Sequence, residues 1–259
     1  MILATIQRLG SSWAILAGII LFALANSQID AFAGTQVEAL LARGDGELRA
    51  GHYAIARRCY LSALAYERDN VKILLKAAQA EEKIGDLDSA IKRARLVTQI
   101  DPKNVDGHAA LGRYLEANRD PKAAELQYER AIELSKDQSE ATSLEGKAIR
   151  LLIDLDDLDR ADRLSLSCLK GNKKNAESHY FRGLVLSKSE RQPRMQEALK
   201  EFQQTLALAP ECNAVHYQSA LLYLKLGQKD EATQELKTFI KNNPPKNELE
   251  EAKGRLEQI

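Results

Sequence analysis

The chain contains a repeat of 34 residues, and this repeat limits the folds that it can adopt. The clearest copy is Val71–Asn104, which contains two short amphipathic stretches. A first helix is predicted over Val71–Ile84; it ends at Gly85, and Asp86 is placed to cap the next helix. Pro102 ends the unit, because proline cannot continue a helix. The second helix has one apolar face with a spacing of three or four residues, formed by Leu87, Ala90, Ile91, Ala94, Val97 and Ile100.

The same length recurs without gaps on both sides of this unit, as Val37–Asn70 and Val105–Gln138. When positions are numbered from the start of each unit, position 8 is always small: Gly44, Ala78, Gly112, Gly146, Gly183 and Ala220. Position 20 is always alanine: Ala56, Ala90, Ala124, Ala161, Ala198 and Ala232. Small side chains at both positions let the two helices of a unit approach closely. Bulky side chains at position 24 are expected to fill the adjoining space: Tyr60, Tyr128 and Phe202.

This pattern resembles the tetratricopeptide repeat, whose period is 34 residues and whose helix-turn-helix units stack in a row. The resemblance covers roughly residues 37–246. It implies an all-α fold, a right-handed α-solenoid of about six helix-turn-helix repeats over residues 34–246. Units four and five, Ser139–Asn175 and Ala176–Cys212, contain 37 residues each. Their three additional residues are expected in the turns between helices, around Asp154–Arg160 and Ser187–Pro193.

Residues 247–259 are predicted to form a C-terminal capping helix. Asn247 is a suitable N-cap, and Glu250 stands three residues later, as in a capping box. The apolar residues that follow one face are Leu249, Ala252, Leu256 and Ile259. A lone helix with one apolar face is the expected cover for the last repeat of a solenoid. The alternative is that this helix docks onto a neighbouring molecule.

Residues 1–33 have the order of regions found in a secretory signal peptide. Arg8 precedes an apolar run, Trp13–Ala25, and the small residues Ala31 and Ala33 form a cleavage pattern before Gly34. The alternative is an uncleaved membrane anchor, although Leu9–Ala25 barely reaches the length of a membrane span. Both interpretations place the repeats on the outer side of the membrane. We therefore expect an exported protein, periplasmic or secreted, with membrane contact only through residues 1–33 if these are retained.

The charge of the chain is balanced, with 37 basic and 37 acidic residues. Such a chain has no global field to attract nucleic acid. The three cysteines, Cys59, Cys168 and Cys212, are expected to be free thiols, because neighbouring helices lie too far apart for a bridge between distant units.

Metal and catalytic sites are not predicted. His108, His179 and His216 all stand at position 4, so successive rings lie about one repeat apart and cannot share a zinc ion. The run Asp154–Asp159 lacks the spacing of a calcium loop, and one of its aspartates is expected to cap a helix. No nucleophile elbow, P-loop or dinucleotide motif occurs, so neither a cofactor nor an enzymatic activity is expected.

The binding surface is predicted from the resemblance, which implies a concave groove lined by positions 2, 5, 9 and 12 of each first helix. In the second half of the chain these positions carry a basic group, Arg113, Lys147 and Arg150, followed by an apolar and aromatic row, Tyr180, Leu184, Tyr217 and Leu221. This order suits a protein segment with an acidic part beside an apolar part. The alternative is that Tyr180 and Tyr217 only pack against adjacent helices. The clamp that some members use for C-terminal carboxylates is not matched, since its positions carry Leu41, Asp45, Leu75 and Gln79.

The predicted function is therefore an extracytoplasmic scaffold or adaptor that binds a protein or peptide partner, with envelope assembly as one form of that role. The alternative is a structural subunit of a larger envelope complex that associates with itself.

Overall fold

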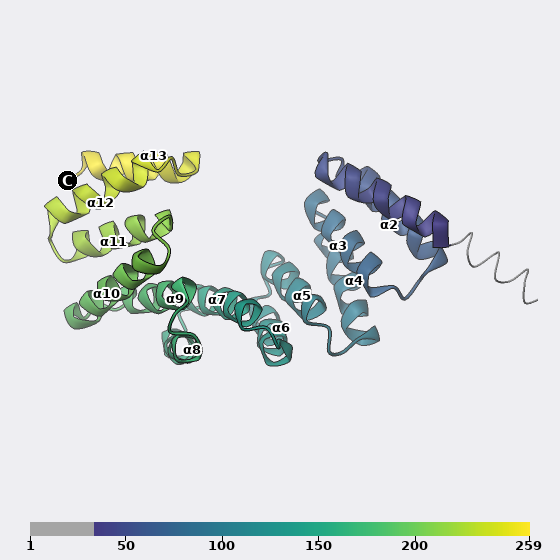
Figure 1. Cartoon of the computed structure of the whole chain (residues 1–259), viewed down its shortest axis with the longest axis horizontal. Coiled ribbons are helices and arrows are strands. Elements are labelled where there is room, and N and C mark those ends of the chain that lie inside the picture. Colours follow the sequence, from purple (N-terminus) through teal and green to yellow (C-terminus); the bar gives the residue numbers. More distant parts are fainter. Residues whose placement is uncertain (1–33) are drawn as a thin grey trace, which may run out of the picture. The chain divides into compact units, whose positions relative to one another are not determined.

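The computed structural model describes residues 34–259, and the predicted signal peptide lies outside them. The chain divides after Lys103 into two compact units, which are described separately (Figure 1). Every regular element in the described residues is a helix, so the predicted all-α class is confirmed. No helix among these residues has the length and apolar character needed to cross a membrane.

Unit 1 contains a helical stretch over residues 34–49 and three further helices. These are α2 (Tyr53–Tyr66), α3 (Val71–Ile84) and α4 (Leu87–Ile100). The sequence explains the ends of α3 and α4. Gly85 ends α3 in the left-handed conformation, with φ of 90°, and its N–H donates to Glu81 and Glu82 carbonyls. The Asp86 carboxylate then accepts the N–H of Ser89 and caps α4, as predicted.

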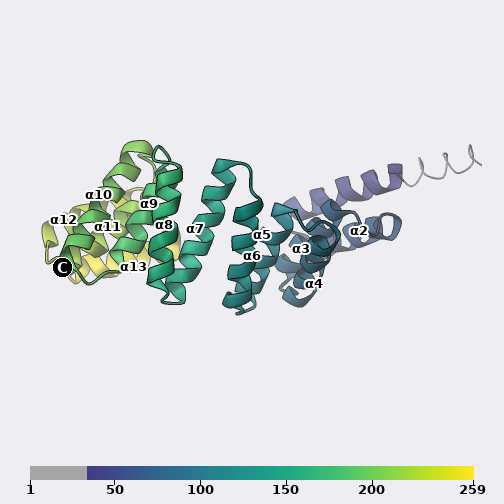
Figure 2. The same cartoon turned by 90° about the horizontal axis from the view of Figure 1, so that it is seen from below.

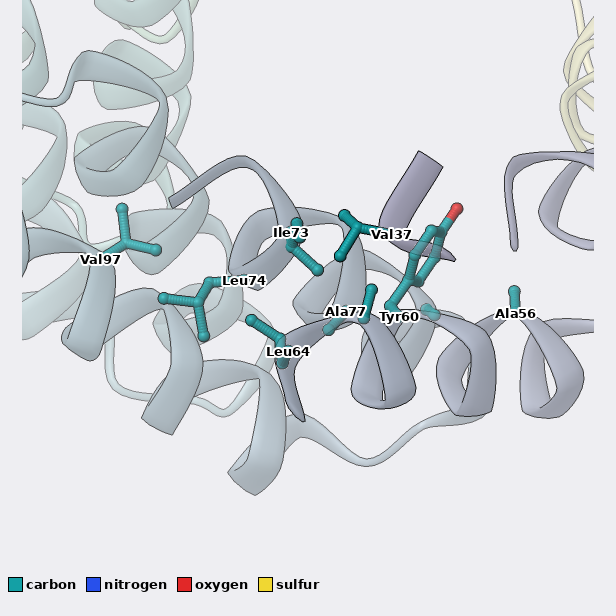
Figure 3. Close-up of a cluster of buried hydrophobic side chains, with 10 residues drawn as sticks. Val37, Ala56, Tyr60, Leu64, Ile73, Leu74, Ala77 and Val97 are labelled. Carbon is teal, nitrogen blue, oxygen red and sulfur yellow. The ribbon is translucent and has the colours of Figure 1, made fainter. Parts of the chain in front are cut away.

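The core of unit 1 lies where α2 and α3 pack against each other and against residues 34–49 (Figure 3). Tyr60 and Ala56 of α2 are fully buried beside Val37, and Ile73 of α3 is buried in the same cluster. The Tyr60 hydroxyl still has a polar partner, because it donates to Asp45 Oδ1 at 2.7 Å. Burial raises the pKa of this hydroxyl, and the bond to the Asp45 carboxylate adds to the rise.

Unit 2 holds the remaining helices. In chain order they are α5 (Val105–Ala117), α6 (Pro121–Leu134), α7 (Gln138–Asp154), α8 (Leu158–Gly171), α9 (Ala176–Ser187), α10 (Gln192–Leu208), α11 (Asn213–Lys225), α12 (Lys229–Lys241) and α13 (Lys246–Glu257). Within each repeat the first helix packs on the second: α5 on α6, α7 on α8, α9 on α10 and α11 on α12 (Figures 1 and 2).

Close packing inside each repeat depends on the small residues predicted to allow it. All six position-20 alanines have no solvent exposure. A Cβ atom added to Gly112 would lie 2.9 Å from the Tyr128 ring, and one added to Gly183 would lie 2.6 Å from the Phe202 ring. In repeats one, three and five, the position-8 glycine therefore lies against the position-24 ring of its own repeat, and a side chain at position 8 would force that ring to move.

Repeat four solves the same packing problem with a residue from the next repeat. Its position 24 is Ser165, which is too small to reach Gly146. Phe181 of α9 fills the space instead, and a Cβ atom on Gly146 would overlap its ring. Because the aromatic ring in this space comes from α9, the packing of repeat four depends on repeat five.

The extra residues of repeats four and five are not in the turns, so this expectation is wrong. In repeat four they lengthen α7, which has 17 residues, whereas α5 has 13. In repeat five they lengthen α10 at its start, and Pro193 stands in its first turn. Proline is tolerated there because first-turn N–H groups have no partner inside the helix.

The C-terminal helix packs on the last repeat. Ala252 of α13 is fully buried, and Leu256 and Ile259 pack against the cluster around Leu236 and Phe239. The predicted cap residue is wrong: α13 begins one residue before Asn247, after Pro245, and no side chain caps it. The helix starts earlier because Pro245 itself supplies an extended residue before the first turn.

Candidate functional site

The site residues predicted from the sequence lie on the first helices of unit 2. We call the side of α7, α9 and α11 that carries positions 2, 5, 9 and 12 the first-helix face. Helix α9 contacts both α7 and α11, so residues on these three helices are close enough to act together. Helix α5 contacts α6, which in turn contacts α7.

The basic residues of the predicted site are exposed. Lys147 and Arg150 lie one turn apart on α7, and both are open to solvent. The Arg150 guanidinium carbon lies 5.6 Å from the centre of the Phe181 ring, within the range of a cation–π contact. Arg113 is exposed on α5, where it lies 5.0 Å from the Tyr114 ring centre and donates to the Tyr114 hydroxyl at 3.2 Å. Arg150 therefore contacts the aromatic residue Phe181 of α9, whereas Arg113 contacts Tyr114, the next residue of its own helix.

Tyr180 is half-buried between two aromatic rings. Its ring centre lies 5.6 Å from that of Phe181, in an edge-on arrangement, and 6.1 Å from that of Phe202. Burial raises the pKa of its hydroxyl, and the nearby Arg150 cation acts in the opposite direction. Tyr180 therefore packs against neighbouring side chains, as the alternative interpretation proposed, and also leaves part of its ring beside an exposed cation.

Tyr217 is covered by the C-terminal helix. Its ring centre lies 5.1 Å from that of Phe239, and its hydroxyl accepts a hydrogen bond from Arg255 Nε at 3.0 Å. Arg255 also forms an ion pair with Glu251 at 3.0 Å. Burial raises the pKa of the Tyr217 hydroxyl, and a hydrogen bond to Glu251 adds to the rise. The sequence predicted α13 either as a cap or as a helix that docks onto a neighbouring molecule, and Glu251 and Arg255 also place it beside Tyr217 of the candidate site.

The leucines of the predicted site differ in exposure. Leu184 is 8% exposed and belongs to the interior, so it supports the first-helix face from below. Leu221 is half-buried and lines a hollow of about 170 Å³ between the ends of α9 and α11. The other residues that line this hollow are Ser187, Lys188, Gln218, Leu222 and Lys225.

Lys188 and Lys225 were missed because both stand at position 13, one residue beyond the positions that the resemblance assigns to the groove. Their recurrence at the same position in successive repeats was the available signal. The α13 residues could be found by extending the 34-residue register past the sixth repeat. Starting a seventh unit at Asn247 places Glu251 at position 5 and Arg255 at position 9.

Helix α9, at the centre of the site, is fixed by a buried cation. Arg182 is 5% exposed and donates to Asp162 Oδ1 at 2.8 Å and to Ser165 Oγ at 3.1 Å, both on α8. Asp162 is shared with Arg194 of α10. Because a buried charge without partners is strongly unfavourable, this network holds α8, α9 and α10 in one arrangement.

The histidines form paired contacts within their repeats. His179 Nδ1 lies 2.6 Å from Glu201 Oε2, and His216 Nδ1 lies 2.6 Å from Glu235 Oε2. His108 Nδ1 lies 2.9 Å from Gln127 Oε1. Gln127, Glu201 and Glu235 all stand at position 23 of their repeats. Each ring thus links a first helix to its second helix. No group of residues able to hold a metal ion occurs within residues 34–259.

The expectations about the aspartates and the cysteines hold in the structure. The Asp157 carboxylate accepts the N–H of Arg160 and caps α8. Cys59 and Cys168 are free and buried, and Cys212 is free and half-buried.

Comparison with known proteins agrees with this architecture. A family model described as tetratricopeptide repeat matches residues 41–105 and 190–247. No curated protein matches the sequence. A tetratricopeptide repeat protein from Parabacteroides merdae is similar in structure, with a TM-score of 0.71, 15% identity and 86% of each chain covered. PilF of Pseudomonas aeruginosa gives a TM-score of 0.64 at 14% identity, over 86% of this chain and 99% of that one.

A third similar structure is YrrB, described as a tetratricopeptide repeat protein with an unusual peptide-binding site. Its TM-score is 0.52 at 16% identity, over 75% of this chain and 97% of that chain. At these identities the solved structures show the fold alone. The matched family model adds the repeat itself, over residues 41–105 and 190–247. The chain therefore contains tetratricopeptide repeats.

Proposed function

We propose that this chain is an exported adaptor that holds a segment of a partner protein on its first-helix face. Tetratricopeptide repeats are protein-interaction scaffolds, and the helices of unit 2 supply the surface that such a scaffold needs. The observation that carries the proposal is the junction of Arg150 with Tyr180 and Phe181, where an exposed cation adjoins a partly exposed aromatic group. Such a junction fits a partner segment in which acidic and apolar residues are neighbours.

The compartment is part of the proposal and rests on the sequence of residues 1–33. A basic residue, an apolar run and a small-residue cleavage pattern support export, with the repeats on the outer side of a membrane. A role in envelope assembly would follow from that location. The adaptor has no proposed reaction of its own.

The first experiment recovers the partner. The exported protein, purified from its own compartment under mild conditions, should retain a defined protein that mass spectrometry identifies. Recovery of the chain with no protein other than itself would favour the alternative, a subunit that associates with itself.

The second experiment tests the first-helix face against that partner. Lys147→Glu combined with Arg150→Glu should slow association and weaken its salt dependence, because exposed charges act mainly on the encounter of two proteins. Tyr180→Ala should instead speed dissociation, with a loss near ~2 kcal/mol for an interfacial aromatic anchor. Lys200→Glu combined with Lys237→Glu is the matched control, since both lysines are exposed on second helices. The proposal fails if the control and the test pair change the rates equally, or if Tyr180→Ala lowers the Tm and leaves affinity intact.

A further inference from the structure

The hollow between α9 and α11 combines an apolar floor with two cationic side chains. Leu221 and the fully buried Leu222 form the apolar part, and Gln218 supplies a polar group. Lys188 and Lys225 stand at the last turns of α9 and α11, and both are exposed. The volume, about 170 Å³, is the size of one or two side chains and far too small for a folded domain.

The two lysines have no carboxylate partner among the described residues. Lys225 Nζ lies 3.5 Å from the Ser187 carbonyl oxygen, a long contact that leaves most of its donor capacity unused. By contrast, Arg160 in the same unit has carboxylates within reach and pairs with both Glu125 and Glu129. Two unpaired ammonium groups at one hollow therefore form a local excess of positive charge.

We propose that this hollow receives an acidic side chain from an internal segment of the partner, with an apolar neighbour of that residue placed on Leu221. This inference rests on the proposed function and names the chemistry that the site selects. The Lys188 and Lys225 ammonium groups supply the charge complementarity, and Gln218 and Ser187 border the same space.

An internal segment fits better than a chain end, because the binding surface continues on both sides of the hollow. Towards α7 it reaches Arg150 and Tyr180, and away from α7 it reaches Tyr217, where α13 adds Glu251 and Arg255. A segment that follows this surface passes through the hollow and does not end in it.

The spacing of the helices sets the spacing of the acidic residues. Neighbouring packed helices lie about 8–10 Å apart. A segment in the polyproline II conformation has three residues per turn and advances about 3.1 Å per residue, so side chains three residues apart lie on one face and span the distance from one first helix to the next. A carboxylate that faces Arg150 on α7 is thus expected three residues away from the carboxylate that enters the hollow beside Lys188.

The probe is a displayed library of twelve randomised residues between fixed flanks, so that no member has a free terminal carboxylate near the random segment. The exported protein is used as the target, and a second library presents the same random segment with a free C-terminus. We expect the first library to yield peptides with two acidic residues three apart and a leucine-like residue beside one of them. Lys188→Glu combined with Lys225→Glu should weaken such a peptide roughly tenfold or more and should select basic residues in place of the acidic residue.

The control variant is again Lys200→Glu with Lys237→Glu, which should bind the selected peptide as the unmodified protein does. Circular dichroism and the Tm of each variant establish that it is folded, and Lys188→Gln with Lys225→Gln tests loss of charge without reversal. The inference is overturned if acidic peptides bind both reversed pairs equally, and the adaptor function then still stands. Enrichment only from the free C-terminus library also overturns it, because the site would then bind a terminal carboxylate. Absence of enrichment from both libraries contradicts the adaptor function and, with it, this site.

Discussion

At the scale of single residues, the sizes and shapes of side chains determine how the helices of each repeat pack. Where position 24 is aromatic, as at Tyr128 and Phe202, the ring lies against the position-8 glycine of the same repeat. In repeat four the ring comes from Phe181, which also touches Tyr180 and lies near Arg150. The residue that completes the packing of repeat four is therefore also part of the candidate site.

Replacing Gly146 by alanine should destabilise unit 2. The new methyl group would overlap the Phe181 ring, and overpacking of this kind typically costs ~1–3 kcal/mol. Chemical denaturation measures the loss. Gly254→Ala is the matched control, since a Cβ atom there meets nothing within 4 Å. Combining Gly146→Ala with Phe181→Leu should cost less than the sum of the single changes, because the smaller side chain makes room. Strict additivity would show that the two residues do not compete for the same space.

The Cys168 thiol predicts a pH dependence of stability. Burial raises its pKa to about 12, from an ordinary value of 9.0. Between these values the unfolded chain loses the thiol proton and the folded chain keeps it, so the folded state loses stability as the pH rises. For one proton the slope is at most about 1.4 kcal/mol per pH unit. Denaturation of the protein and of Cys168→Ala from pH 8 to 11 should give a shallower alkaline decline for the variant. Parallel curves would show that this thiol does not titrate differently on folding.

At the scale of elements, the first helices carry the site and the second helices hold them in place. Helix α9 is the central example, because its buried Arg182 is fixed by Asp162 and Ser165 of α8. Helix α13 packs on the last repeat through Ala252, and its other side is charged, because Lys253 and Glu257 are both exposed.

Introducing a charge at Ala252 should release α13 from the last repeat. Ala252 has no solvent exposure and packs with Ala220, Leu236 and Phe239. Ala252→Asp would bury an unpaired carboxylate, so we expect a lower Tm and faster amide hydrogen exchange in α13, α11 and α12. The pKa of the Tyr217 hydroxyl should also fall, because the variant removes its cover. Lys253→Asp, at an exposed position of the same helix, is the control. An unchanged Tm for Ala252→Asp would contradict the packing of α13.

At the scale of the whole molecule, each unit is a row of helices that contact their neighbours in sequence. In unit 2 the contacts run from α5 to α13, and first helices meet across repeats at α7, α9 and α11. Stability in such an array is close to a sum of repeat terms and neighbour terms. Substitutions at Gly146 should therefore affect repeats four and five more than the last repeat.

A further prediction at this scale concerns the first residue of the exported protein. If residues 1–33 are a signal peptide, mass spectrometry of the exported protein should find Gly34 as the first residue. The apolar run Trp13–Ala25 is the reason, because its length suits cleavage better than a stable membrane span. An intact Met1 in a membrane fraction that resists high-salt extraction would establish the anchor instead.

The repeat register determined most of the fold. Helix ends are local events, so Gly85, Asp86 and Asp157 specify them through conformation and capping, and the structure agrees at each. The pattern of small residues also fixed which faces meet, because only alanine or glycine allows that approach. The additional residues of repeats four and five were misplaced for a physical reason. Whether three additional residues extend a turn or a helix depends on whether one more helical turn can pack against neighbouring helices. The length of the repeat carries no information about that packing.

Which residues share the candidate site depends on packing between helices, and the repeat register does not contain this information. Lys188 and Lys225 are far apart in sequence, and the contact of α9 with α11 brings them to one hollow. In the same way Arg255 reaches Tyr217 only because α13 folds back on the last repeat. Such contacts depend on how successive helices are rotated and packed. Sequence periodicity determines the face of its helix on which a residue lies. Packing between helices determines which residue of the neighbouring helix it contacts.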